Sequence, residues 1–185
     1  MTDDSAHQRR QRDTQIERWT TDARKLVASG KEVAALELYR RAADELPGAP
    51  WLQHRTGELS RKLKQDGVAI AYFRRAATAF QMANFPKRAL APLRTAWTLA
   101  EGGLPATAKT LVEVAGELMQ LHRQLGFKPD ASVVFERTNA ALRSRGFAEM
   151  PAQLLDSVPP RSAQQPSEKA SSSRGQAFAR LLSRR

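Results

Sequence analysis

The sequence predicts an all-α fold that contains an internal repeat, and three observations lead to this prediction. Residues 14–148 are rich in Ala, Leu, Arg, Lys and Glu, which favour helix, and their apolar residues do not alternate with the period of two expected of strands. Glycine and proline interrupt this region at intervals of about one helix length. One stretch of residues also recurs 34 positions later in the chain.

Turn-forming residues divide this region into seven expected helices, at residues 14–29, 31–46, 50–64, 67–83, 86–101, 105–124 and 130–145. Six of them end at a glycine, the most common residue after a helix C-terminus: Gly30, Gly48, Gly67, Gly102, Gly126 and Gly146. The third, fifth and sixth begin with a proline, which the first turn tolerates, and Asp130 can cap the seventh. Pro92 lies well inside the fifth helix, where its missing amide hydrogen should kink the helix or delay its start.

The segments outside these helices differ in composition, and they divide the chain into four parts. Residues 1–13 are polar throughout, so we expect a disordered arm. Residues 14–150 form the helical domain. Residues 151–174 are rich in Pro and Ser with few apolar residues, which predicts a disordered linker. Residues 175–185 become apolar and basic again, which indicates a short amphipathic docking peptide.

A small–aromatic–small pattern recurs 34 residues apart, first as Ala35, Tyr39 and Ala42 and then as Ala69, Phe73 and Ala76. A weaker echo follows at Ala89, Leu93 and Ala96. Small residues let two helices approach closely, while the aromatic ring fills the groove between them. The pattern therefore predicts that neighbouring helices approach closely at these positions.

This pattern resembles the tetratricopeptide repeat (TPR) family, which has a period of 34 residues. Residues 16–81 match about two repeats, and residues 86–147 look like a degenerate continuation or a capping pair. The resemblance implies a solenoid of antiparallel helix pairs whose concave side holds peptides or partner helices. The alternative is an ordinary amphipathic helical bundle.

Composition excludes several classes of protein. None of the 185 residues is a cysteine, which rules out disulfide frameworks, cysteine-ligated zinc and iron–sulfur clusters. No apolar run approaches the roughly 20 residues of a membrane span, and residues 1–13 lack the apolar core of a signal peptide. We therefore expect a soluble protein without a transmembrane segment, and we take a cytoplasmic, bacterial protein as the working hypothesis.

Positive charge is concentrated in the middle of the expected helical domain. The formal net charge is +11, and residues 50–94 hold nine basic residues against two acidic ones. In the third helix, Trp51 and Arg55 lie on a stripe beside the apolar one, and the TPR resemblance implies that this side faces the concave groove. The predicted partner-binding groove is lined by Arg24, Trp51, Arg55, Glu58, Lys62, Arg74 and Thr78. In the alternative interpretation, Trp51 packs between repeats and the cations only solvate a helix face.

The potential catalytic residues form no recognisable constellation. His54 and His122 fall on separate helices, and His7 lies in the expected arm. Glu113 and Glu117 share a helix face, but acidic residues four positions apart are usually solvent-facing. No phosphate-binding loop, metal-binding helix motif or nucleophile elbow is present. We predict a protein that is not an enzyme and that uses neither a cofactor nor a metal ion.

The C-terminal residues have the pattern of a docking motif, formed by Phe178, Arg180, Leu181, Leu182, Arg184 and Arg185. In a helix the three apolar residues would share one face, and a flexible linker would let the segment fold on binding. The segment loosely resembles the cargo-loading peptides of bacterial encapsulin shells. Its receptor can be another protein, an anionic membrane or the chain's own groove, or the segment can be a basic solubilising tail.

These observations lead to two hypotheses of function. The first is a non-enzymatic adaptor whose TPR-like groove binds an acidic or amphipathic segment of a partner protein, while the C-terminal motif docks to a second partner. The alternative is a basic helical protein associated with nucleic acid, whose binding would weaken steeply with salt.

Overall fold

The structure is a computed structural model that describes residues 3–103 and 106–156. Every regular element in these two ranges is a helix, and none is a strand. The helices are α1 (Asp3–Ala28), α2 (Glu32–Glu45), α3 (Pro50–Lys62), α4 (Asp66–Met82), α5 (Pro86–Gly102), α6 (Ala108–Gln124), α7 (Lys128–Arg143) and the short α8 (Gln153–Asp156). The all-α class predicted from the sequence is therefore confirmed for the described residues.

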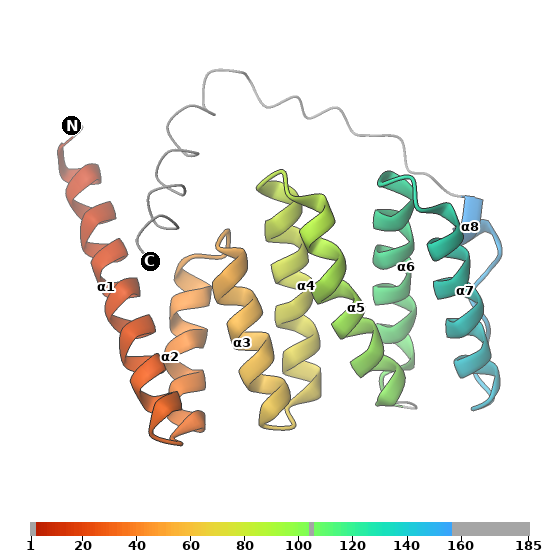
Figure 1. Ribbon diagram of the computed structural model, residues 1–185, viewed down its shortest axis with the longest axis horizontal. Helices are drawn as coiled ribbons and strands as arrows, with labels where there is room; N and C mark the ends of the chain where they lie inside the picture. Colours follow the sequence, from red (N-terminus) through yellow and green to blue (C-terminus); the bar gives the residue numbers. More distant parts are fainter. Residues whose placement is uncertain (1–2, 104–105, 157–185) are drawn as a thin grey trace.

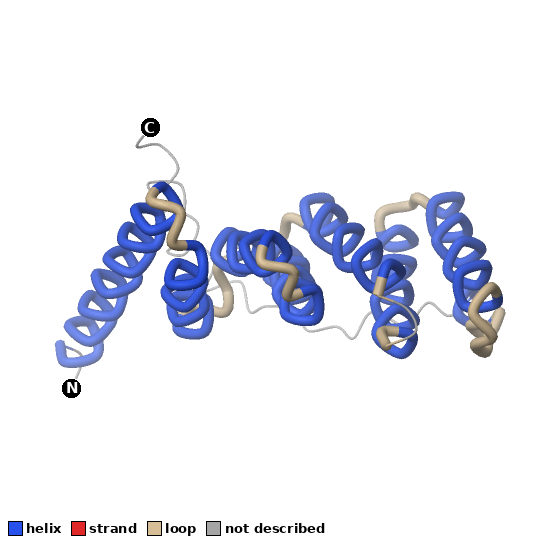
Figure 2. The backbone as a smooth tube through the Cα atoms, turned by 90° about the horizontal axis from the view of Figure 1, so that it is seen from below, coloured by secondary structure: helices blue, strands red, loops and turns tan. Residues whose placement is uncertain are grey.

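The first seven helices stand side by side in chain order, and successive helices run in opposite directions (Figure 1). Each helix packs mainly against its neighbours in the chain. The same row is seen from below in Figure 2. Because the chain reverses after every helix, the loops that follow α2, α4 and α6 lie along one edge of the row, and the loops that follow α1, α3 and α5 lie along the other.

Helix bounds agree with the predictions to within three residues for α2 to α7. The prediction for the N-terminus was wrong, because α1 begins at Asp3 and includes most of the expected disordered arm. Two aspartates start this helix, where carboxylates favour the N-terminal dipole, and the Gln and Arg residues that follow are good helix formers. Helix α5 begins at Pro86 and continues through Pro92, so its start is not delayed. Residues 157–174 of the expected linker lie outside the described residues.

The repeated pattern forms core contacts. Its four alanines, Ala35, Ala42, Ala69 and Ala76, are fully buried, as is Phe73. Gly57 of α3 faces the Phe73 ring so closely that a Cβ atom at Gly57 would lie 3.0 Å from Phe73 Cδ1. Helices α3 and α4 can therefore approach this closely only because position 57 has no side chain.

The buried residues form two clusters that meet at α4. One cluster joins α1, α2 and α3 and takes Tyr72 from α4. The other extends from α4 to α7 and takes Ile70 and Phe73 from α4. Within the second cluster, Trp97 Nε1 donates a buried hydrogen bond of 3.0 Å to Thr138 Oγ1, which ties α5 to α7. Among the helices of the described ranges, none is long and apolar enough to cross a membrane.

Candidate functional site

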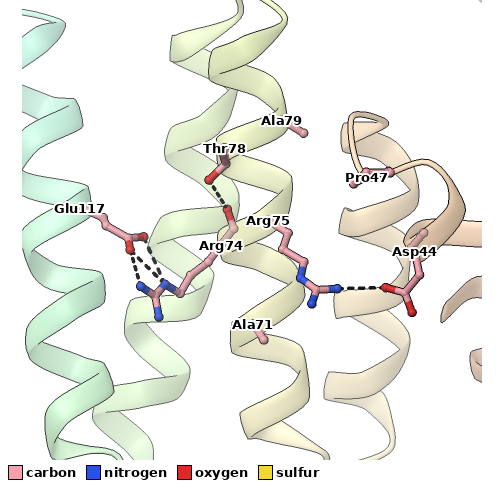
Figure 3. A pocket seen from close by; sticks show the side chains of 9 residues that line it. Asp44, Pro47, Ala71, Arg74, Arg75, Thr78, Ala79 and Glu117 are labelled. Carbon is pink, nitrogen blue, oxygen red and sulfur yellow. Dashed lines mark hydrogen bonds and ion pairs between the residues drawn. The ribbon is translucent and has the colours of Figure 1, made fainter. Parts of the chain in front are cut away.

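The candidate site is a groove of about 620 Å³ on the side of the row formed by α2, α4 and α6 (Figure 3). Ion pairs join these helices to one another, from α4 to α2 and from α4 to α6, so they share this side. The lining residues are Ala43, Asp44, Pro47, Ala71, Arg74, Arg75, Thr78, Ala79 and Glu117. The groove thus takes its side chains from three helices and the loop after α2.

Arg74 joins α4 to α6 at one end of the groove. Its Nε lies 3.1 Å from Oε1 of Glu117 and 3.3 Å from Oε2, and its NH1 lies 3.1 Å from Oε2 of Glu113. The hydrogen bonds to Glu117 raise the pKa of Arg74, so the guanidinium stays charged. Both carboxylates hold this side chain in a fixed position between the two helices.

Arg75 joins α4 to α2 at the other end. Its NH1 donates to Asp44 Oδ1 at 3.1 Å, and its guanidinium lies 5.0 Å from the centre of the Tyr72 ring. With Arg74 and Glu117, these residues give the groove lining two positive and two negative charges. The lining is therefore balanced in charge, although the chain as a whole is strongly basic.

A second hollow of about 250 Å³ continues the groove along α4 and α6, because it shares Thr78 and Glu117 with the first. Its other lining residues are Ala77, Gln81, Leu93, Gln120, Leu121 and Gln124. A glutamine carboxamide both donates and accepts hydrogen bonds, as the main chain of a polypeptide does. The carboxamides of Gln81, Gln120 and Gln124 can therefore form hydrogen bonds with the main chain of a peptide in the continued groove.

The structure divides the predicted groove residues into two sets. Arg74 and Thr78 line the observed groove, whereas the five residues predicted on α1 and α3 do not: Arg24, Trp51, Arg55, Glu58 and Lys62. Phe73 of α4 packs against Gly57 of α3. Since Phe73 faces α3, the next residue, Arg74, points away from α3 and towards α6.

The five residues on α1 and α3 lie elsewhere on the surface. Trp51 and Arg55 are exposed, as is Arg24. Glu58 pairs with Arg61 at 3.5 Å on its own helix, and Lys62 pairs with Glu32 of α2. None of them lines the groove or the second hollow, so the groove predicted on α3 stays a prediction. The docking motif from Phe178 to Arg185 lies outside the described residues.

Sequence reasoning missed the acidic side of the groove. Glu113 and Glu117 were interpreted as solvent-facing, although both pair with Arg74 of α4. The available signal was the pair of acids four residues apart on α6, which can hold one arginine from another helix. Using that signal requires knowing that α4 and α6 share a side, which the sequence does not show.

Neither His54 nor His122 lines the groove or the second hollow. Burial lowers the pKa of His54, whose ring packs edge-on against Phe73 with 5.5 Å between the ring centres. Burial also lowers the pKa of His122, which is a buried residue of α6. Its Nδ1 has no hydrogen-bond partner among the described residues. Across residues 3–103 and 106–156, no three His, Cys, Asp or Glu residues are grouped as a metal site.

No family model matches the chain, and neither does any curated protein. Among solved structures, the chain is similar to the crystal structure of BtubC (BKLC) from P. vanneervenii, with 13% identity over 74% of this chain and 66% of that chain. The TM-score is 0.37, which is too low to support a conclusion about fold or function.

Proposed function

We propose that this protein is a non-enzymatic scaffold of TPR-like architecture that binds an extended segment of a partner protein. The observation that carries the proposal is the continuous groove along α2, α4 and α6, which combines apolar patches with glutamine and paired ionic side chains. A polypeptide needs both kinds of contact, because its side chains bury apolar area while its backbone must keep its hydrogen bonds.

The net charge favours an acidic or amphipathic partner. Arg74 and Arg75 already pair with carboxylates, so they serve mainly to shape the groove. Attraction comes instead from exposed cations outside it: Arg55 and Arg94 have no ion-pair partner in the described part of the chain. A positive surface raises the rate at which an acidic segment arrives, and the groove then holds it. In this proposal the C-terminal motif docks to a second partner, and the protein acts in the cytoplasm.

The test uses a random-peptide display library with the full chain as bait. Thr78→Trp fills the point where the two hollows meet, and Thr98→Trp is its matched control. Both threonines are exposed and donate their hydroxyl to the carbonyl four residues earlier, but Thr98 lies on α5 outside the groove. We expect the selected peptides to be acidic and to lose at least about tenfold in affinity for Thr78→Trp only. Equal binding to both variants would refute the groove.

The charge of +11 also favours a second candidate function, binding to nucleic acid. Phosphate contacts release counterions, so such binding falls steeply with salt. Affinity for an oligonucleotide that vanishes at high salt and does not respond to Thr78→Trp, together with the absence of any selected peptide, would favour this second candidate.

A further inference from the structure

The second hollow, between α4 and α6, differs in charge from the chain as a whole. Glu117 is the one charged side chain in its lining, and in the described part of the chain no lysine or arginine lines it. Arg74 lines only the first groove, and Arg123 of α6 donates instead to Leu154 O of α8. The hollow therefore presents a carboxylate and no cation, in a chain whose formal net charge is +11.

Arg74 does not cancel the negative charge at this end of the groove (Figure 3). Its single guanidinium pairs with two carboxylates, because Nε lies 3.1 Å from Glu117 Oε1 and NH1 lies 3.1 Å from Glu113 Oε2. Lys109 lies eight residues before Glu117 on α6, which is about 12 Å along the helix and beyond the Debye length of about 8 Å at physiological salt. These three paired side chains therefore keep one negative charge.

The polar side chains around the hollow include three carboxamides that make no hydrogen bond within the described part of the chain. They belong to α4 and α6, at Gln81, Gln120 and Gln124. Each carboxamide both donates and accepts, whereas the Glu117 carboxylate only accepts. Thr78 donates its hydroxyl to Arg74 O at 3.2 Å, so its oxygen remains as an acceptor. The lining therefore offers more acceptors than donors, which favours an occupant that donates.

The rest of the lining is apolar and comes from three fully buried side chains, Ala77, Leu93 and Leu121. A methylene chain can lie against such a surface while the charged group at its end keeps its polar contacts. The volume of about 250 Å³ is below the roughly 300–1,000 Å³ of pockets for drug-sized ligands. The hollow is therefore of a size for one side chain.

From these observations, we propose that the second hollow binds one basic side chain, lysine or arginine, of the partner segment. This inference rests on the proposed function, because the occupant belongs to the segment that the first groove holds. The charged group donates to Glu117 and to the carboxamide oxygens, while its methylene stem covers the apolar lining. The carboxamide NH2 groups stay available for main-chain carbonyls of the segment. A partner that is acidic overall is thus expected to carry one basic residue at this point.

The first experiment uses propylguanidinium, which has the head group and stem of an arginine side chain, and propylurea as its neutral counterpart. Each is added at millimolar concentration to the full chain, and NMR follows the carboxamide NH2 signals. We expect propylguanidinium to shift the signals of the three glutamines of the hollow and to leave that of Gln15, which is exposed on α1, unchanged. The proposal is overturned if propylguanidinium shifts none of the three, or if propylurea shifts them equally.

The second experiment changes the charge of the hollow and measures peptide binding. Gln124→Lys adds a cation and Gln124→Glu adds a carboxylate, and both are good helix formers at this exposed last residue of α6. Gln15→Lys is the matched control, since Gln15 lines neither hollow. Peptides selected with the unchanged chain should share one basic position. They should bind Gln124→Lys about tenfold more weakly, Gln124→Glu more tightly and Gln15→Lys equally well.

The outcomes separate this inference from the proposed function. Peptides that share no basic position, or that bind Gln124→Lys as well as Gln15→Lys, overturn the basic-residue pocket, although weaker binding to Thr78→Trp would still support the groove. Failure to select any peptide contradicts the proposed function instead. In that case the propylguanidinium experiment still decides whether the hollow binds a basic group.

Discussion

Replacing Gly57 with alanine tests the close packing of α3 against α4. The added Cβ would lie 3.0 Å, 3.1 Å and 3.2 Å from three atoms of the fully buried Phe73 ring. Crowding a packed core by one methyl group costs about 1–3 kcal/mol, whereas alanine is favoured over glycine in a helix by about 1 kcal/mol. We therefore expect Gly57→Ala to lower the free energy of unfolding by about 1 kcal/mol.

Gly116→Ala is the matched control, because Gly116 lies within α6 and a Cβ there meets no atom within 4 Å. This variant gains helix propensity without crowding, so it should be stabilised by about 0.5–1 kcal/mol. The two variants should then differ by about 4–8 °C in melting temperature for a chain of this size. Thermal unfolding followed by circular dichroism measures this difference. If Gly57→Ala is as stable as Gly116→Ala, the close approach of α3 and α4 is wrong.

Two further predictions concern buried polar groups. Burial lowers the pKa of His122 from 6.5, so the contribution of the neutral imidazole to stability is complete above about pH 6.5 and is lost as pH falls towards the folded-state pKa. The free energy of unfolding in urea should therefore be lower at about pH 5 than at about pH 7.5, and His122→Gln should reduce this difference. An unchanged pH dependence in that variant would contradict the burial of a neutral His122. Thr138→Val leaves Trp97 Nε1 without its acceptor at 3.0 Å and should lower the free energy of unfolding in urea by about 1–3 kcal/mol. Thr95→Val, which removes an exposed hydrogen bond to Ala91 O, should change stability little, and equal effects of the two substitutions would argue against the buried bond.

The helices were predictable where their signals are local. Glycine and proline mark the ends of α2 to α7, and a residue's effect on the turn beside it does not depend on distant parts of the chain. The start of α1 was missed because residues 3–13 have no apolar stripe, and periodicity is the signal on which the prediction relied. Helix-forming polar residues at a chain end produce no such stripe.

The site was only partly predictable, because a groove depends on which helix faces meet. Arg74 and Thr78 were identified, but Glu117 lies 43 residues from Arg74 in sequence. In the fold, Phe73 packs against Gly57 of α3, while the neighbouring Arg74 turns towards Glu117 of α6. No local pattern contains that information, so the prediction combined residues that the fold keeps apart.

The meeting of both buried clusters at α4 has a consequence for how the protein opens. Tyr72 and Phe73 are adjacent in sequence, yet each belongs to a different cluster. Since each helix packs mainly against its neighbours, opening that begins at α1 can progress through α3 without disturbing α5 to α7. Helix α4 is therefore the element that couples the two halves, and their cooperativity depends on how firmly these two aromatic rings are held.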